Sequence, residues 1–317
     1  MQLFWGKSRF GEITMTFGAV LGSVELGLIY SIMALGVFLS FRTLNTPDLT
    51  VDGSIVTGMA VSAMICSVGG NPWLALVAAF IVGCFAGFIT ALLNTKLGIQ
   101  PLLAGILVML GLYSINLRIM GGKSNVAIIK SDTIYKNFRE FAQTEYSSII
   151  LGLIILTLIT ACFYYFLKTR LGFALRATGD NEDMVRASGI NSNTMRLIGM
   201  GLSNGLVGLA GGLLAQYQSV ADIGMGVGMV VVGLASVIIG EAVFGTRSLI
   251  RRLIAVSLGA ILYRMIIAFA FNFGMPSTDL KLVSAVIVTF ALSTGALGEK
   301  FSIPTLFQKV GAKNANN

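Results

Sequence analysis

The sequence has no histidine and few charged residues. Only 11% of its 317 residues are Asp, Glu, Lys or Arg, whereas soluble domains carry about 25%. The missing histidine excludes serine–histidine–aspartate hydrolysis, histidine metal sites and the usual proton shuttle. The three cysteines (Cys66, Cys84 and Cys162) lie in apolar runs without CxxC spacing. They are therefore interpreted as packing residues, and no metal site is expected.

The sequence also lacks the polar–apolar alternation of membrane barrel strands. Hydrophobic residues make up 55% of the chain, and its mean hydropathy is +0.85. They form runs of about 20 residues, which is the length of a transmembrane helix. A lipid-exposed backbone must satisfy its own hydrogen bonds, so we predict an all-α polytopic membrane protein. Basic cytoplasmic loops account for the net charge of +8, and no nucleic-acid partner is expected.

We predict about nine transmembrane helices, within a range of eight to ten. The whole chain, 1–317, would form one transmembrane domain with a longer external loop at 121–146. All five prolines fall at predicted boundaries, where they break no helical hydrogen bond. The expected spans are 17–40, 53–68, 73–93, 102–120, 147–167, 197–217, 225–244, 253–273 and 281–297.

Basic residues predict the orientation of the chain. Segment 168–196 is the longest polar run in the middle of the sequence and carries several arginines. If it is cytoplasmic, Arg42, Lys96, the 247–252 arginines and the C-terminus are also cytoplasmic, and the N-terminus is external. The four-span halves on either side of the fifth span then have opposite orientations. Each half has a long helix, an acid-bearing loop and a glycine-rich helix, which predicts an inverted repeat.

The cytoplasmic segment contains the signals of a short helix. Asp180 or Asn181 can cap it, Glu182 and Asp183 fall in its first turn, and Gly189 can end it. We interpret it as a surface helix on which a soluble partner docks. The alternative is a plain solvated loop.

Charged residues in or beside the apolar runs are candidates for a translocation path. Glu25 and Arg264 lie well inside spans, where ionisable groups are costly and often functional; a structural ion pair is the equal alternative. Asp48 and Asp52 flank a short span after a connection containing Pro47. Their carboxylates could meet a translocating zwitterion or simply cap a helix.

Other residues of the later spans favour packing. Asn204 and Gln216 could bind a substrate, although we favour hydrogen bonds to another helix. Glu241 is expected to reach Arg247, Arg251 or Arg252. Four glycines at helical spacing would permit close helix approach, and four tyrosines could stack on an aromatic substrate or lie at membrane interfaces. They are Gly201, Gly205, Gly208 and Gly212, and Tyr30, Tyr113, Tyr217 and Tyr263.

Four stretches together resemble a known family. They read GSVELGLIYSIMALGVFLSFR, TPDLTVDGSIVTG, GFALRATGDNEDMVRASGIN and GLSNGLVGLAGGLLAQ. Over about residues 22–297 the chain resembles the permease subunits of bacterial ABC importers, in the branched-chain amino acid, ribose and nucleoside permease family. PDLTVDGS and VVGLASVIIGEAVFG look most like a subgroup associated with tryptophan or tyrosine uptake.

The resemblance implies a permease of the bacterial cytoplasmic membrane that pairs with a second copy. It also implies an ABC ATPase dimer on the cytoplasmic side, a substrate-binding protein or lipoprotein outside, and membrane lipid around the helices. The chain has no GxxxxGK[ST] motif, so it would be no enzyme and hold no cofactor, with ATP and Mg²⁺ in the ATPase. The residues expected to couple to the ATPase are Gly179, Asp180, Asn181, Glu182, Asp183, Arg186, Ala187 and Gly189.

The predicted function is inward, ATP-driven transport of a small polar metabolite. An aromatic amino acid is the first expectation, and a branched-chain amino acid or a nucleoside is the alternative. A secondary transporter would instead use Glu25, Asp48 or Asp52 to couple to an ion gradient. The absence of histidine and of paired carboxylates disfavours an intramembrane enzyme, and the absence of a filter-like repeat disfavours a channel.

Overall fold

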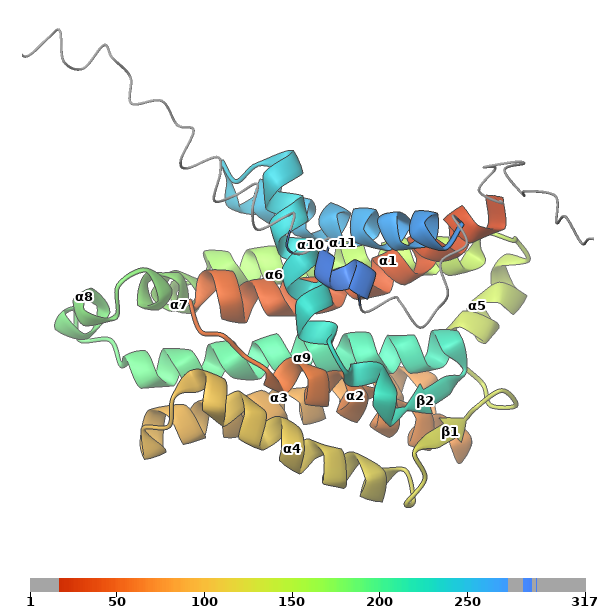
Figure 1. Ribbon diagram of the computed structural model, residues 1–317, viewed down its shortest axis with the longest axis horizontal. Coiled ribbons are helices and arrows are strands. Elements are labelled where there is room, and N and C mark those ends of the chain that lie inside the picture. The colour runs from red at the N-terminus through yellow and green to blue at the C-terminus, as the bar shows by residue number, and fades with distance from the viewer. Residues whose placement is uncertain (1–16, 273–281, 287–288, 290–317) are drawn as a thin grey trace, which may run out of the picture.

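The computed structural model describes residues 17–272, 282–286 and 289, and these form a bundle of helices (Figure 1). Within these described residues, eight helical segments are long and apolar enough to cross a membrane. The chain is thus an all-α polytopic membrane protein. The elements are α1 (Phe17–Val37), η1 (Phe38–Thr43), α2 (Thr50–Ser67), α3 (Pro72–Leu97), α4 (Pro101–Ile119), β1 (Asn125–Ala127), α5 (Ile134–Ala142), α6 (Ser147–Lys168), α7 (Arg170–Asp180), α8 (Glu182–Ala187), α9 (Ser192–Gln218), β2 (Val220–Asp222), η2 (Ile223–Gly226), α10 (Met229–Phe244) and α11 (Leu249–Asn272).

The predicted spans agree with these helices to within a few residues. Pro72 and Pro101 begin α3 and α4, where a missing N–H costs nothing, and the Asn71 side chain caps α3. The ninth predicted span, 281–297, lies largely outside the described residues, as do Pro276 and Pro304.

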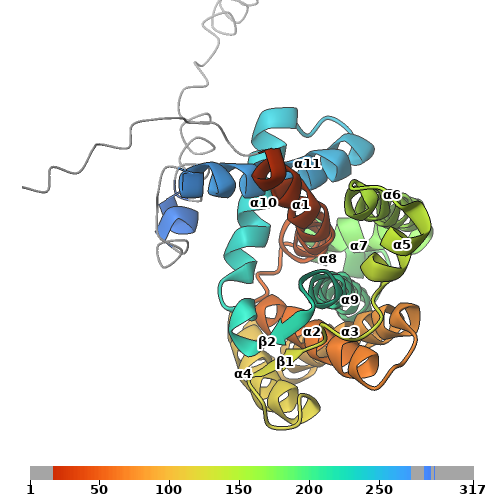
Figure 2. The ribbon, with the colours of Figure 1, turned by 90° about the vertical axis from the view of Figure 1, so that its right-hand side faces the viewer.

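Helix α9 forms the centre of the bundle. It packs against α2 and α3 on one side and against α1 on the other, with α4 beyond α2 and with α6 and α11 beyond α1 (Figures 1 and 2). Helices α7 and α8 lie at one end of the bundle, whereas α5 and the antiparallel β1–β2 pair lie at the other (Figure 1). The two ends therefore carry different surfaces.

The two halves of the chain pack in an inverted way. Helices α1 and α9 run in opposite directions (Figure 1). Helix α3 packs along α9, and the corresponding α11 packs along α1. In each half a short non-helical stretch, 44–49 or 220–222, follows the long helix before the next spanning segment begins. This exchange of partners supports the predicted inverted repeat.

Glycines let the central helices approach to backbone contact. A Cβ added at Gly58 of α2 would lie 1.9 Å from the carbonyl oxygen of Gly208 in α9, and one at Gly211 would lie 2.0 Å from that of Ile55. The same holds toward α3, where a Cβ at Gly83 would lie 2.3 Å from the Asn204 carbonyl oxygen. The predicted packing role of the α9 glycines is confirmed at Gly205 and Gly208, where an added Cβ would clash with Cys84 and with the Ala79 carbonyl oxygen of α3. Gly201 has ordinary space around it.

Candidate functional site

The first element of the candidate site is the N-terminus of α10, which lies inside the bundle. After β2 the chain turns back through η2, and a Cβ at Gly226 would lie 2.2 Å from the Asp52 carbonyl oxygen. Helix α10 then crosses the other spanning helices at a steep angle (Figures 1 and 2). A helix that starts within the bundle exposes unpaired N–H groups there, so they need an acceptor.

Asp52 supplies that acceptor from α2. Its carboxylate oxygens accept hydrogen bonds from the backbone N–H groups of Gly228, at 2.9 Å, and Val230, at 2.8 Å. The negative charge also complements the positive end of the α10 dipole. Asp52 was predicted either to line the path or to cap a helix. It does cap a helix, but the helix belongs to the other half of the chain.

Two cavities flank this capped N-terminus. The larger, of about 200 Å³, is lined by Asp52, Tyr113, Asn116 and residues of η2. The smaller, of about 120 Å³, is lined by Asp48 and by Val230 of α10. Asn116 is buried, and its Oδ1 has no hydrogen-bond partner among the described residues. The larger cavity is thus mostly apolar with three polar side chains, Asp52, Tyr113 and Asn116, which is the usual make-up of a site for a small molecule.

Asp48 and Asn204 form a buried network at the middle of the bundle. The Asn204 Nδ2 donates to Asp48 at 2.6 Å, and the Ser54 hydroxyl donates to Asn204 Oδ1 at 2.7 Å. Asp48 also accepts from the backbone N–H of Thr50, the first residue of α2, at 2.8 Å. These bonds join α9 to the start of α2, so the favoured role of Asn204 as a helix contact is confirmed.

Gln216 joins three elements to α9 near the α5 end of the bundle. Its Nε2 donates to the Ser62 hydroxyl at 3.1 Å and to the Pro72 carbonyl at 3.0 Å, and its Oε1 accepts from the Ile134 N–H at 3.0 Å. Its amide is therefore committed to holding α2, α3 and α5 around α9.

Glu25 and Arg264 find aromatic partners. The Tyr217 hydroxyl donates to the Glu25 carboxylate at 2.5 Å, whereas the Arg264 guanidinium lies 4.7 Å from the centre of the Tyr30 ring. Tyr135 of α5 packs edge-on against Tyr217, with 5.3 Å between ring centres. Burial, with the nearby Tyr217 and Glu25, raises the pKa of Tyr135. The structure thus groups Glu25 with tyrosines at the α5 end of the bundle.

The second element of the candidate site is the α7–α8 pair. Asn181 caps α8 by accepting from the Met184 N–H at 3.0 Å, and Gly189 follows it with a φ of +79°. The predicted short helix is confirmed, although the segment contains a second helix, α7, that was not predicted. The side chains of Asp180, Asp183 and Met184 are exposed.

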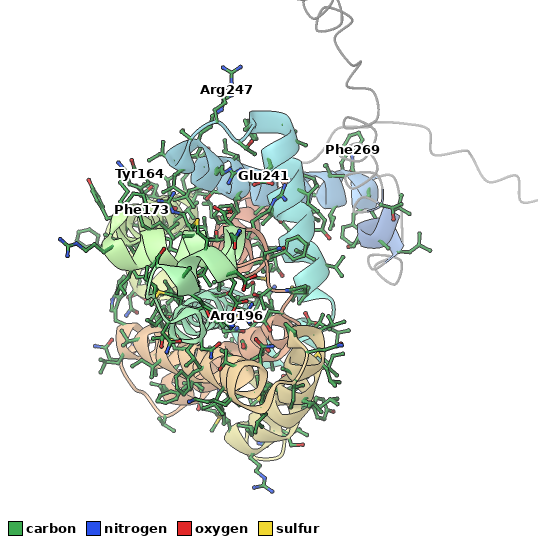
Figure 3. The ribbon with its side chains drawn as sticks, turned by 90° about the vertical axis from the view of Figure 1, so that its left-hand side faces the viewer. Tyr164, Phe173, Arg196, Glu241, Arg247 and Phe269 are labelled. Atoms are coloured by element: carbon green, nitrogen blue, oxygen red, sulfur yellow. The ribbon has the colours of Figure 1, made fainter. Side chains whose placement is uncertain are left out.

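Glu182 turns inward and fastens α8 to the start of α9. Its carboxylate binds Arg186 at 2.6 Å and Arg196 at 2.5 Å, and it accepts from the Ser192 hydroxyl at 3.0 Å. Figure 3 views this end of the bundle and labels Arg196. The exposed face of α8 is therefore held in a fixed position.

One predicted ion pair is wrong. Glu241, which is buried, binds Arg42 at 2.7 Å instead of Arg247, Arg251 or Arg252. The 245–248 turn directs Arg247 away from Glu241, outward from the bundle (Figure 3). Arg251 instead donates from its Nε to the Phe244 carbonyl at 2.6 Å. The pair therefore joins the two halves of the chain rather than one helix to its own turn.

Sequence patterns did not predict the cavity-lining role of Asn116 or of several arginines at the α7 end. Asn116 is a lone amide within an apolar span, which was the one available signal. The arginines indicated only the orientation of the chain, because their convergence depends on the packing of η1, α7 and α11.

Spanning helices in an inverted arrangement, with a helix that starts inside the bundle beside two cavities, define a multi-pass membrane transport protein. Comparison with known proteins assigns the family. Residues 19–292 match the model of the branched-chain amino acid transport system permease component, so the chain belongs to this family of ABC-importer permeases. It is accordingly a transport subunit and not an enzyme. In such importers the ATPase is a separate subunit, and ATPase and substrate-binding partners follow from the family.

The chain is similar to three permeases of differing names. It is 40% identical over 88% of its length to the tyrosine transport system permease protein of Clostridioides difficile, covering 92% of that protein. It is 27% identical to the probable branched-chain amino acid transport permease protein LivH of Methanocaldococcus jannaschii, over 62% of this chain and 67% of that one. The chain is also 27% identical to the ribose import permease protein RbsC of Escherichia coli, over 83% of this chain and 81% of that one. No solved structure matches the chain.

Proposed function

We propose that the chain is the permease of an ATP-driven importer for an aromatic amino acid, with tyrosine first, and that its ATPase docks on the α7–α8 pair. The observation that carries the docking proposal is the fixed, exposed face of α8. The ion pair between Glu182 of α8 and Arg196 of α9 would transmit a displacement of α8 by the ATPase to the central helix of the bundle. The coupling residues Gly179, Asp180, Asn181, Glu182, Asp183, Arg186, Ala187 and Gly189 all belong to this pair or its ends.

The charge distribution supports a cytoplasmic position for this end, in a bacterial cytoplasmic membrane. Basic residues concentrate there, as expected for the cytoplasmic side. The loop with α5 and the start of α1 would then face outward, where a binding protein delivers the substrate. The basic residues of the α7–α8 end are Arg42, Lys96, Lys168, Arg170, Arg176, Arg186, Arg196, Arg247, Arg251 and Arg252.

Two copies of the permease would bind the two ATPase subunits, which supply ATP and Mg²⁺. The translocation path would pass the capped N-terminus of α10, between the cavities that Asp52 and Asp48 line. Tyr113 and Asn116 in the larger cavity suit a phenol-bearing amino acid. Similarity to the tyrosine permease supports this substrate. A branched-chain amino acid or a nucleoside is the alternative.

Changing the exposed face of α8 is expected to release the ATPase. The variant Asp183→Lys with Met184→Asp alters two exposed side chains and leaves the Glu182 ion pairs in place. We expect the ATPase to be lost from the complex purified in mild detergent, and uptake in membrane vesicles to fall to background. The permease itself should remain at its normal level in the membrane, because no buried contact is changed.

The matched control is Glu140→Lys with Phe141→Asp. It makes the same kind of change on two exposed residues of α5, at the opposite end of the bundle. This control should retain the ATPase. If the α8 variant keeps its ATPase and its uptake, the docking proposal is wrong. Transport by the purified chain alone under an ion gradient would instead show a secondary transporter.

A further inference from the structure

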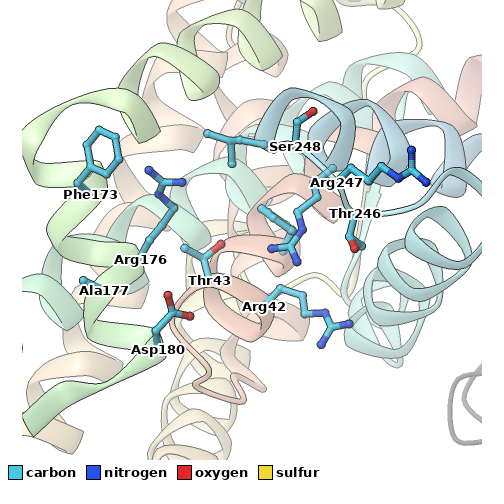
Figure 4. A pocket seen from close by; sticks show the side chains of 12 residues that line it. Arg42, Thr43, Phe173, Arg176, Ala177, Asp180, Thr246, Arg247 and Ser248 are labelled. Atoms are coloured by element: carbon cyan, nitrogen blue, oxygen red, sulfur yellow. The ribbon is translucent and has the colours of Figure 1, made fainter. Parts of the chain in front are cut away.

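A basic cavity of about 450 Å³ lies between η1, α7 and the start of α11 (Figure 4). Arg42, Arg176, Arg247 and Arg252 line it, and Asp180 is the one carboxylate among its described lining residues. Arg42 is already paired with Glu241. Arg247 lies at the rim and points outward, so Arg176 and Arg252 are the two arginines that face this cavity without an ion pair, opposite the single acid Asp180.

Two of these arginines have unused donors. The Nε of Arg176 and the Nε of Arg252 are buried, and neither has a hydrogen-bond partner among the described residues. Arg176 is held in place because its guanidinium lies 4.5 Å from the centre of the Phe173 ring. A buried N–H without an acceptor is costly, so an anion with several oxygens would fit here.

A second, apolar groove is also lined by the first turn of α11. It has a volume of about 380 Å³ and runs between α6 and α11, where Leu153, Leu156, Ile254 and Leu258 are among the lining residues. The polar groups among its described lining residues are a few hydroxyls. Ile250 lines the groove, and the preceding residue, Leu249, lines the basic cavity. The basic cavity and the hydrocarbon-lined groove thus lie beside consecutive residues at the start of α11.

We propose that this cavity and groove together bind one anionic phospholipid. Its phosphate would lie between Arg176 and Arg252, and one acyl chain would lie between α6 and α11. Basic pockets between spanning helices are suited to acidic headgroups. The groove favours a lipid over an acidic side chain of a protein partner, because such a partner would leave the apolar α6–α11 surface uncovered. This lipid site does not depend on which substrate is transported.

The test is native mass spectrometry of the purified permease titrated with phosphatidylglycerol and, separately, with phosphatidylcholine of the same acyl chains. We expect the wild type to prefer phosphatidylglycerol. Each arginine near an acidic headgroup is worth about fivefold in affinity, so Arg176→Gln with Arg252→Gln should weaken phosphatidylglycerol binding roughly 25-fold. The control variant Arg118→Gln with Lys123→Gln, at the other end of the bundle, should bind as the wild type does.

Filling the groove distinguishes a lipid from free phosphate. Ile254 is half exposed, so Ile254→Trp should fold normally while blocking the acyl chain. It should weaken phosphatidylglycerol binding and leave binding of inorganic phosphate unchanged. Equal binding of both lipids, or wild-type binding by the double arginine variant, would overturn the proposal. It would also be overturned if that variant kept the lipid but lost the ATPase, which would make the cavity a protein contact.

Discussion

Asp52→Ala is expected to reduce uptake at least about tenfold. Transport requires the capped start of α10, and destabilising that arrangement by 1.4 kcal/mol lowers its population about tenfold. The substitution removes the acceptor for the N–H groups of Gly228 and Val230. A donor left unpaired inside the bundle costs about 1–3 kcal/mol. Helix α10 would then lose its fixed start between the two cavities.

We would measure uptake of labelled tyrosine by the wild type, Asp52→Asn and Asp52→Ala at equal protein level, and we expect uptake to fall in that order. Asparagine keeps one oxygen acceptor and should retain intermediate activity. The matched control is Asp222→Ala, which removes another capping carboxylate. Asp222 accepts from the Gly224 N–H at 2.6 Å, but it lies at the exposed β2 end. Its uptake should stay near that of the wild type. Full uptake by Asp52→Ala would show that transport does not depend on the capped N-terminus of α10.

Gly58→Ala is expected to be strongly destabilising. The added methyl group would lie 1.9 Å from the Gly208 carbonyl oxygen, and a backbone oxygen cannot rotate away. Helices α2 and α9 would have to separate. Overpacking typically costs about 1–3 kcal/mol, and this contact belongs at the upper end or beyond it. The apparent melting temperature of the detergent-solubilised protein should fall by roughly 5–10 °C.

Gly201→Ala is the matched control, because it makes the same substitution in α9. Its nearest neighbour outside its own helix would be the Cys84 carbonyl oxygen at 3.5 Å, an ordinary contact. Alanine is a better helix former than glycine by about 1 kcal/mol, so this variant should be as stable as the wild type or slightly more stable. Equal melting temperatures for the two variants would show that α2 and α9 are less closely packed than the structure has them.

Local patterns predicted the parts of the fold that depend on neighbouring residues. Span positions follow from apolar runs, and the starts of α3 and α4 follow from Pro72 and Pro101. The short helix α8 follows from Asn181, Glu182 and Asp183. Each of these signals acts within a few residues, so it can be read from the sequence.

The partners of the buried polar residues could not be predicted in this way. Asp48 and Asn204 are 156 residues apart, and Asp52 accepts from a backbone group 178 residues away. The sequence shows that such groups need partners but not which ones they find. Glu241 illustrates the failure, because three arginines close in the sequence were expected and the distant Arg42 is the partner.

The sequence by itself determined the class of the protein, its spans and the helix at its charged end, because hydropathy, proline and capping act locally. Only the tertiary structure decided that α10 begins inside the bundle on an Asp52 cap, that cavities flank this point, and that arginines converge beside a groove. These features arise where the two halves of the chain pack against each other. The close backbone contacts that glycines allow set the geometry of these features. That geometry cannot be predicted from any short stretch of sequence.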